Sequence, residues 1–168
     1  MYVKDYIIYH QVTLGASDVT ATFFQEAVGA AANGYYETNL ASVGVLPTPQ
    51  SFLIKAIAIK FLPNAVIADL QAVLAGWFKF EINDQIEIGP MPICFVPEFN
   101  GILAMPDSGS TGTTVPAIGN GANGKNAMVL ERPVTISGGQ QFKLTCTWPT
   151  APNAKTFWWL LIGDLSGA

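Results

Sequence analysis

Charged residues are scarce in this sequence. Asp, Glu, Lys and Arg make up 12% of the chain, about half of the roughly 25% usual in a soluble domain, while 50% of the residues are hydrophobic. The eight basic residues are scattered singly and the net charge is −4, which argues against nucleic-acid binding through a basic stripe. With so few charges to cover a free monomer, we expect apolar surface to be buried against other copies or partners.

Histidine and cysteine are also rare. His10, the one histidine, lies among apolar neighbours in a predicted first strand over residues 6–14, which favours a hydrogen-bonded structural histidine over a metal ligand or general base. Cys94 and Cys146 are far apart in apolar segments, so they form no Cys-x-x-Cys motif and are expected to be buried and unpaired. We therefore expect no catalytic residue, no metal site and no cofactor.

Long uninterrupted apolar segments are missing. Residues 1–14 carry Lys4, Asp5 and His10 and lack the apolar region of a signal peptide. The longest candidate for a membrane span, residues 54–74, is interrupted by two lysines, a proline and an aspartate. We expect neither a cleaved leader nor a transmembrane helix.

Instead, the sequence is dominated by short segments in which apolar and polar residues alternate. Over residues 141–148 every second residue is apolar, the period of a strand buried on one face. A Ser-Gly-Gly-Gln segment precedes it, and the pattern predicts a hairpin in which Ile136 faces Phe142. Residues 157–162 follow as a strand that is apolar on both faces, so both faces must be covered.

A central strand and one helix are predicted in the middle of the chain. Residues 51–61 are apolar in both parities, as in a strand covered on both faces. Asn64 is a suitable N-cap for a helix that ends at Gly76 and covers this strand. Further strands are predicted over residues 19–28, 36–45, 78–82, 86–88 and 91–99.

Two carboxylates are predicted to face each other in one hairpin. A three-residue turn pairs Ile82 with Ile86 and places Glu81 opposite Glu87. Such a pair suits a glycosidase or a cation site. Like charges on an exposed face usually stay solvated, so we favour a solvated pair eased by Lys79.

A glycine-rich loop spans residues 106–126. In it Gly119, Gly121 and Gly124 match the spacing of dinucleotide-binding loops, and the last glycine precedes a lysine as in a phosphate-binding loop. Asn126 stands where such a loop carries Ser or Thr, and no strand or full helix flanks it. We attribute the spacing to chance and expect the loop to be a site of mobility or of contact with a neighbouring subunit.

Eight or nine short strands, one helix and no βαβ rhythm predict an all-β fold. Specifically, we expect a single jelly-roll antiparallel β-sandwich with one short α-helix, in one domain over residues 1–168. The segment Arg-Pro-Val-Thr-Ile-Ser-Gly-Gly-Gln-Gln-Phe-Lys-Leu at 132–144 precedes Phe-Trp-Trp-Leu-Leu-Ile-Gly-Asp at 157–164. Together they resemble the last strands of single jelly-roll major capsid proteins of tailless icosahedral, membrane-containing double-stranded DNA bacteriophages.

This resemblance implies a structural virion protein without catalysis. The subunit would be made in the host cytoplasm and located in the virion, where it self-associates or pairs with a second coat protein into capsomers of an icosahedral shell, close to an internal viral membrane. No nucleic acid or small-molecule substrate is expected to bind directly. The candidate interface residues are Trp158, Trp159, Leu161, Gly119 and Gly121.

The alternative is a carbohydrate-binding β-sandwich module that uses exposed tryptophans, although core packing is favoured for each of Trp77, Trp148, Trp158 and Trp159. One further expectation concerns residues 157–162. No second helix remains to cover this strand. The side chains on one of its two faces are therefore expected at a subunit interface or under a long loop.

Overall fold

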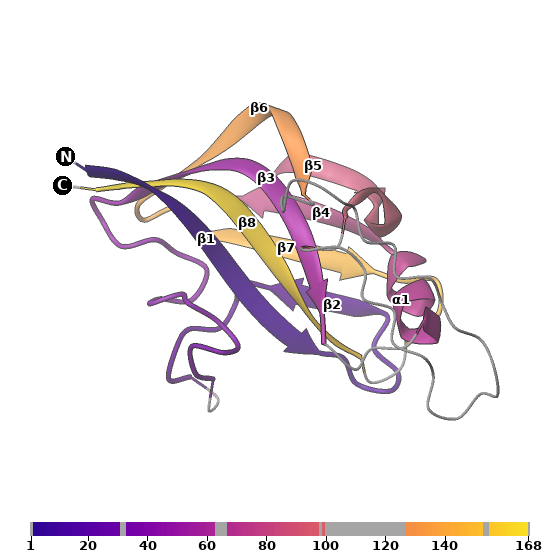
Figure 1. The fold of residues 1–168 in the computed structure, drawn as a ribbon. Helices are drawn as coiled ribbons and strands as arrows, with labels where there is room; N and C mark the ends of the chain where they lie inside the picture. The colour runs from indigo at the N-terminus through magenta and orange to yellow at the C-terminus, as the bar shows by residue number, and fades with distance from the viewer. Residues whose placement is uncertain are drawn as a thin grey trace.

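The computed structural model describes residues 2–30, 33–62, 67–97, 99, 127–152 and 155–167. Within these ranges the chain forms eight strands, one α-helix and one short 3₁₀ helix (Figure 1). The elements are β1 (Tyr2–Thr13), β2 (Thr20–Phe23), β3 (Ser51–Phe61), α1 (Ile67–Leu74), β4 (Trp77–Ile82), β5 (Gln85–Pro92), η1 (Ile93–Phe95), β6 (Met128–Ser137), β7 (Phe142–Thr147) and β8 (Thr156–Gly167).

The strands form two four-stranded sheets, with the orders β1-β8-β3-β6 and β2-β7-β4-β5. All pairings are antiparallel, and they are nested: the first strand pairs with the last, the second with the next to last, and so on to the β4–β5 hairpin. The predicted all-β sandwich with one short helix is confirmed.

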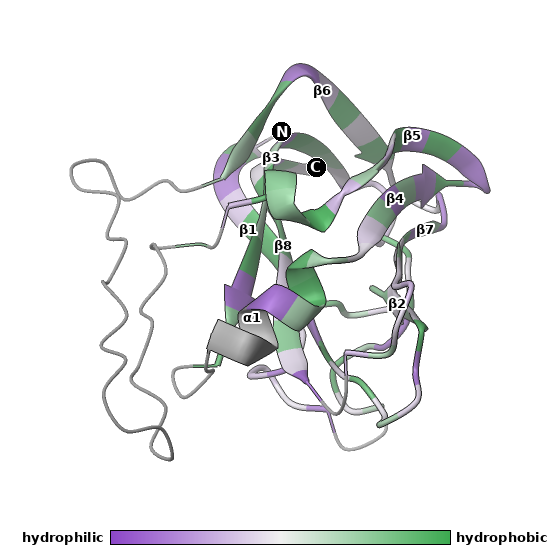
Figure 2. Ribbon diagram, turned by 90° about the vertical axis from the view of Figure 1, so that its right-hand side faces the viewer, coloured by the Kyte–Doolittle hydropathy of each residue, from purple (hydrophilic) through white to green (hydrophobic). Residues whose placement is uncertain are grey.

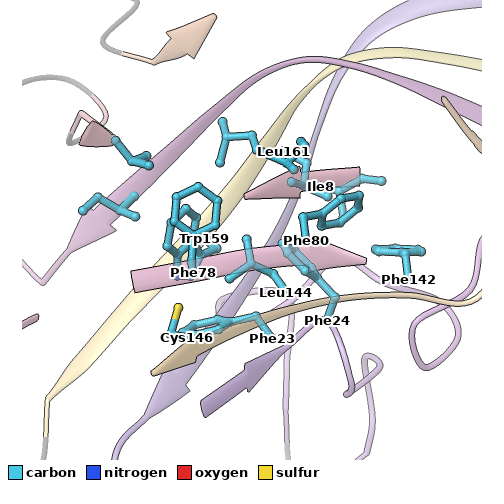
Figure 3. Packing of buried hydrophobic residues seen from close by; sticks show 14 of the residues in the cluster. Ile8, Phe23, Phe24, Phe78, Phe80, Phe142, Leu144, Cys146, Trp159 and Leu161 are labelled. Carbon is cyan, nitrogen blue, oxygen red and sulfur yellow. The ribbon is translucent and has the colours of Figure 1, made fainter. Parts of the chain in front are cut away.

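The core lies between the two sheets and is rich in aromatic side chains (Figure 3). The ring of Phe78 lies 4.7 Å from that of Trp159, and the ring of Phe23 lies 5.2 Å from that of Phe157. Each pair joins one sheet to the other, since β4 and β2 belong to one sheet and β8 to the other. These contacts hold the sandwich together.

Strand β3 has the predicted bounds, and a β-bulge explains its two apolar parities. The register with β8 shifts between Ile54 and Ala56, which leaves Lys55 as the extra residue. Ile54, before the bulge, and Ile57, after it, are both fully buried in the core. The strand therefore keeps large side chains in the core on both sides of the bulge, although the parity changes.

The predicted hairpin between residues 134 and 144 is wrong, because β6 and β7 lie in different sheets. The alternation itself is correct, since Ile136 and Phe142 are both buried in the core. The two glycines between them lie in the connection that crosses from one sheet to the other. A Cβ on Gly138 would lie 2.8 Å from the carbonyl oxygen of Gln50, so the connection packs closely against residues 46–50.

The β4–β5 turn also differs from the prediction. Asn83 and Asp84 both have positive φ, 48° and 61°, as in a two-residue hairpin turn. Glu81 is therefore paired with Ile86, and the predicted pairing of Glu81 with Glu87 is wrong.

Other elements are shorter than predicted. Residues 19–28 hold only the four residues of β2, residues 36–45 contribute isolated bridges at Thr38 and Val45, and the strand predicted over residues 91–99 ends at Pro92, where η1 follows. The remaining residues of these segments form loops.

The helix packs at one end of the sandwich and not over β3 (Figure 1). There the indole of Trp148 donates a hydrogen bond of 2.8 Å to the carbonyl oxygen of Val73. Gly76 follows the helix where the Trp148 ring would lie 2.5 Å from an added Cβ, so this glycine provides space for the ring. The predicted N-cap, Asn64, lies outside the described residues.

Candidate functional site

An apolar cluster lies on the outer face of the β1-β8-β3-β6 sheet, away from the main core. Its buried members are Ala58, Trp158 and Leu160, of which Trp158 is 9% exposed. In a two-layer sandwich this face would ordinarily meet water, so apolar residues here need their own cover. Side chains that pack against the cluster include Ile7, Tyr9, Leu62, Phe99, Ala127 and Ile162.

A loop carrying two tyrosines covers part of this cluster. The Trp158 indole donates a hydrogen bond of 3.0 Å to the carbonyl oxygen of Tyr36, whose ring meets the indole edge-on at 5.3 Å. The Tyr9 hydroxyl donates to the carbonyl oxygen of Tyr35. The side chain of Asn39 holds the loop on the free edge of β1, where it accepts from the amide of Tyr9 at 3.0 Å.

An aromatic groove with a volume of about 350 Å³ opens beside this loop. Tyr35 and Tyr36 are 75% and 62% exposed there, which is high for large apolar side chains. The sequence signal for this site was the pair of adjacent tyrosines in a loop, but it did not indicate which sheet the loop would cover. The lining includes Tyr9, Tyr35, Tyr36, Lys60, Trp158 and Leu160.

The predicted interface residues are separated by the fold. Trp159 and Leu161 are fully buried in the main core (Figure 3), so they offer no surface to a partner. Trp158 lies on the opposite face of β8, in the outer cluster beside the groove. Gly119 and Gly121 lie outside the described residues, as does the whole nucleotide-like spacing.

A second candidate surface is the outer face of the β2-β7-β4-β5 sheet. Figure 2 shows hydrophilic and hydrophobic residues alternating along β4 and β5. Trp77, Lys79 and Glu81 share the outer parity of β4, since Phe78 and Phe80 between them are buried in the core. Their partners on β7 are Thr147, Thr145 and Lys143.

Glu81 is the one buried acidic residue in the part of the chain that the structure describes, with 6% exposure. Its Oε1 accepts from the Lys79 ammonium at 2.9 Å, whereas its Oε2 is buried without a hydrogen-bond partner. Beside it lies a pocket of about 140 Å³, which Glu81, Asp84, Lys143 and Gln25 help to line. Sequence reasoning placed Glu81 on a solvated face and missed this burial.

The lysine nearest to Glu81 across the sheet is paired elsewhere. Lys143 is the β7 partner of Glu81, but its ammonium lies 2.6 Å from Oδ1 of Asp84. The hydrogen bond to Lys143 lowers the pKa of Asp84, and the same bond raises the pKa of Lys143. Oε2 of Glu81 therefore remains an unused acceptor.

His10 has a structural environment. The ring is 1% exposed, and its Nδ1 accepts a hydrogen bond of 2.9 Å from the backbone amide of Phe24. That bond fixes Phe24 in a left-handed conformation with φ of 67°. Burial lowers the pKa of His10, and the Glu26 carboxylate, 3.9 Å from Nε2, opposes this effect.

The tryptophans and cysteines differ in exposure. Trp77 is 39% exposed, while the other three tryptophans are buried. Both cysteines are free, as expected, but only Cys146 is buried; Cys94, in η1, is exposed because the strand predicted there ends before it.

Within the described ranges, no group of three or more His, Cys, Asp or Glu side chains is arranged to hold a metal ion. Among the same residues no helix is long and apolar enough to cross a membrane. Comparison of the chain with protein-family models, with curated proteins and with solved structures finds no match.

Proposed function

We propose that this protein is a structural virion protein: a capsid subunit that self-associates, or pairs with a second coat protein, into capsomers of an icosahedral shell. The observation that carries the proposal is the nested pairing of eight antiparallel strands in two sheets of four. We take this order to be that of a single jelly roll, a fold that recurs in viral capsid proteins as well as in lectins and cupins.

Because one fold hosts several functions, surface chemistry must support the choice. Coat subunits meet one another at very high local concentration, where a low charge limits mutual repulsion. This chain has 12% charged residues and a net charge of −4. Large apolar side chains are exposed in a loop and on several elements, including Tyr35, Ile86, Phe95 and Val129. Such a surface suits a subunit that is covered by its neighbours.

The aromatic groove is the surface we assign to subunit contact. Its exposed tyrosines and the adjacent Trp158 are residue types enriched at the centres of protein interfaces. The rest of the outer cluster is already packed behind them, so the loop with Tyr35 and Tyr36 is anchored in place and needs little ordering on association. The second copy would bury the exposed rings.

A pair of charge substitutions tests this assignment. Tyr35→Glu places a charge on a side chain that is 75% exposed, so the fold should survive while association weakens at least tenfold. Val19→Glu, at an apolar side chain that is 46% exposed next to β2 in the other sheet, is the matched control. Light scattering over a concentration series should show oligomers for the wild type and for Val19→Glu. A strict monomer for the wild type at high concentration, alone and with virion components, contradicts the proposal.

A further inference from the structure

We propose that the outer face of the β2-β7-β4-β5 sheet binds a neutral saccharide. In this proposal Trp77 is a stacking platform, and the pocket beside Glu81 holds the hydroxyl groups of one sugar unit. The site lies on the sheet opposite to the aromatic groove, so the inference does not depend on the capsid proposal.

The first step is the buried carboxylate of Glu81, a residue that lines the pocket. A carboxylate oxygen that is removed from water without a donor is costly, because it loses its hydration and gains nothing in return. Oε2 of Glu81 is in this condition, while Oε1 is occupied by Lys79. No water-sized group reaches Oε2 in this side-chain position. A ligand hydroxyl in the pocket would supply the missing partner once the carboxylate turns toward it.

The charges around the pocket select the class of ligand. Two carboxylates, Glu81 and Asp84, are balanced there by the ammonium groups of Lys79 and Lys143. A metal cation would meet two ammonium groups and an anion would meet two carboxylates, so either would have to displace an existing ion pair. A hydroxyl group is neutral and can both donate and accept. Adjacent hydroxyls of a sugar can therefore donate to Glu81 and accept from a neighbouring donor.

The shape of the pocket also fits a small polar group. Gly44 closes one side with φ of 57°, and its carbonyl oxygen accepts from the amide of Phe142 at 2.7 Å. The side chain of Gln25 donates to the carbonyl oxygen of Phe142 at 3.2 Å and lines the same side. A volume of about 140 Å³ is small and suits part of a sugar ring.

Trp77 extends the site along β4. It lies four residues before Glu81 with the same outward parity, which at about 3.3 Å per residue places it roughly 13 Å away along the strand. Between the two, the outer face carries Lys79, Thr145 and Thr22, whose polar groups can bind hydroxyls. The arrangement favours an oligosaccharide over a single sugar, with one ring stacked on the indole.

The experiment is a titration of the folded wild-type chain with neutral trisaccharides, namely cellotriose, maltotriose, xylotriose and N,N′,N″-triacetylchitotriose, followed by NMR of backbone amides and tryptophan indoles. We expect at least one of them to shift the Trp77 indole and the amides of β4 and β7. Glu81→Ala should weaken that binding about tenfold to a hundredfold, as expected for a hydrogen bond to a charged group. Trp77→Ala should weaken it by a comparable factor.

The control is Phe95→Ala, which removes an aromatic side chain that is 64% exposed in η1 and outside the proposed site, and which should leave the affinity unchanged. If Glu81→Ala fails to fold, the exposed Trp77→Ala and the near-isosteric Glu81→Gln still decide the question. The proposal is overturned if none of the four sugars binds, if binding survives both Trp77→Ala and the Glu81 substitution, or if calcium chloride or lysine alone shifts the β4 signals and the sugars do not.

Discussion

Replacing Gly163 with alanine should destabilise the protein strongly. Gly163 lies in the central strand β8 opposite Ile54, at the bulge of β3. A Cβ added there would lie 1.8 Å from the carbonyl oxygen of Leu53 and 2.8 Å from its carbonyl carbon. Both neighbours are backbone atoms of an interior strand, so no side chain can turn aside to make room.

The size of the effect follows from this geometry. Overpacking a core with a methyl group costs about 1–3 kcal/mol when side chains can adjust. Here the sheet itself must separate at its centre, so we expect a loss of about 3 kcal/mol or more, a large part of the roughly 5–15 kcal/mol by which domains are stable. Lys55 and Asp164, whose ion pair of 2.6 Å spans the bulge, would be pushed apart as well.

Urea unfolding followed by tryptophan fluorescence measures this change as a shift in midpoint. Gly34→Ala is the control, because an added Cβ there meets only the Glu37 carboxylate at 3.4 Å, an ordinary contact; its effect should stay within about 0.5 kcal/mol. If Gly163→Ala unfolds at the same urea concentration as the wild type, the bulge and the β3–β8 register are wrong.

Two further predictions concern titratable side chains. Since burial lowers the pKa of His10 below its ordinary 6.5, the unfolded chain binds the proton more readily, and the stability that neutral His10 contributes should be lost as the pH falls below 6.5. His10→Asn, which keeps an acceptor for the Phe24 amide and does not titrate, should flatten the change in urea midpoint between pH 7.5 and pH 5.5, and an unchanged slope would contradict this role. Burial raises the pKa of Cys146 well above its ordinary value, whereas Cys94 is exposed. A thiol reagent should therefore modify Cys94 alone in the native protein and both cysteines in denaturant; rapid native modification of Cys146 would argue against its place in the core.

The sequence was sufficient to predict the elements that are defined by local periodicity. The bounds of residues 51–61 were correct because apolar side chains occur in both parities along the whole segment, although the bulge at Lys55 accounts for that pattern. The structural role of His10 was also predictable, since alternation alone places it on the core side of β1. Both features depend only on which face of its own strand a side chain occupies, and local alternation determines that face.

Which strands pair with one another could not be predicted in the same way. Alternation in β6 and β7 is equally compatible with a hairpin and with a crossing between sheets, and the outcome depends on distant segments such as residues 46–50, against which Gly138 packs. The pocket beside Glu81 had the same origin, because Gln25 and Gly44, which are far away in the chain, line it together with Glu81. Both candidate surfaces thus depend on loops whose position the local pattern does not encode.

Electron microscopy of the purified protein at rising concentration, alone and after co-expression with the products of its neighbouring genes, tests the capsid proposal most directly. The proposal predicts closed shells or regular capsomers in which the aromatic groove of Tyr35, Tyr36 and Trp158 lies at a subunit contact. Dispersed single subunits under every condition, or regular assemblies in which this groove faces solvent throughout, would contradict it.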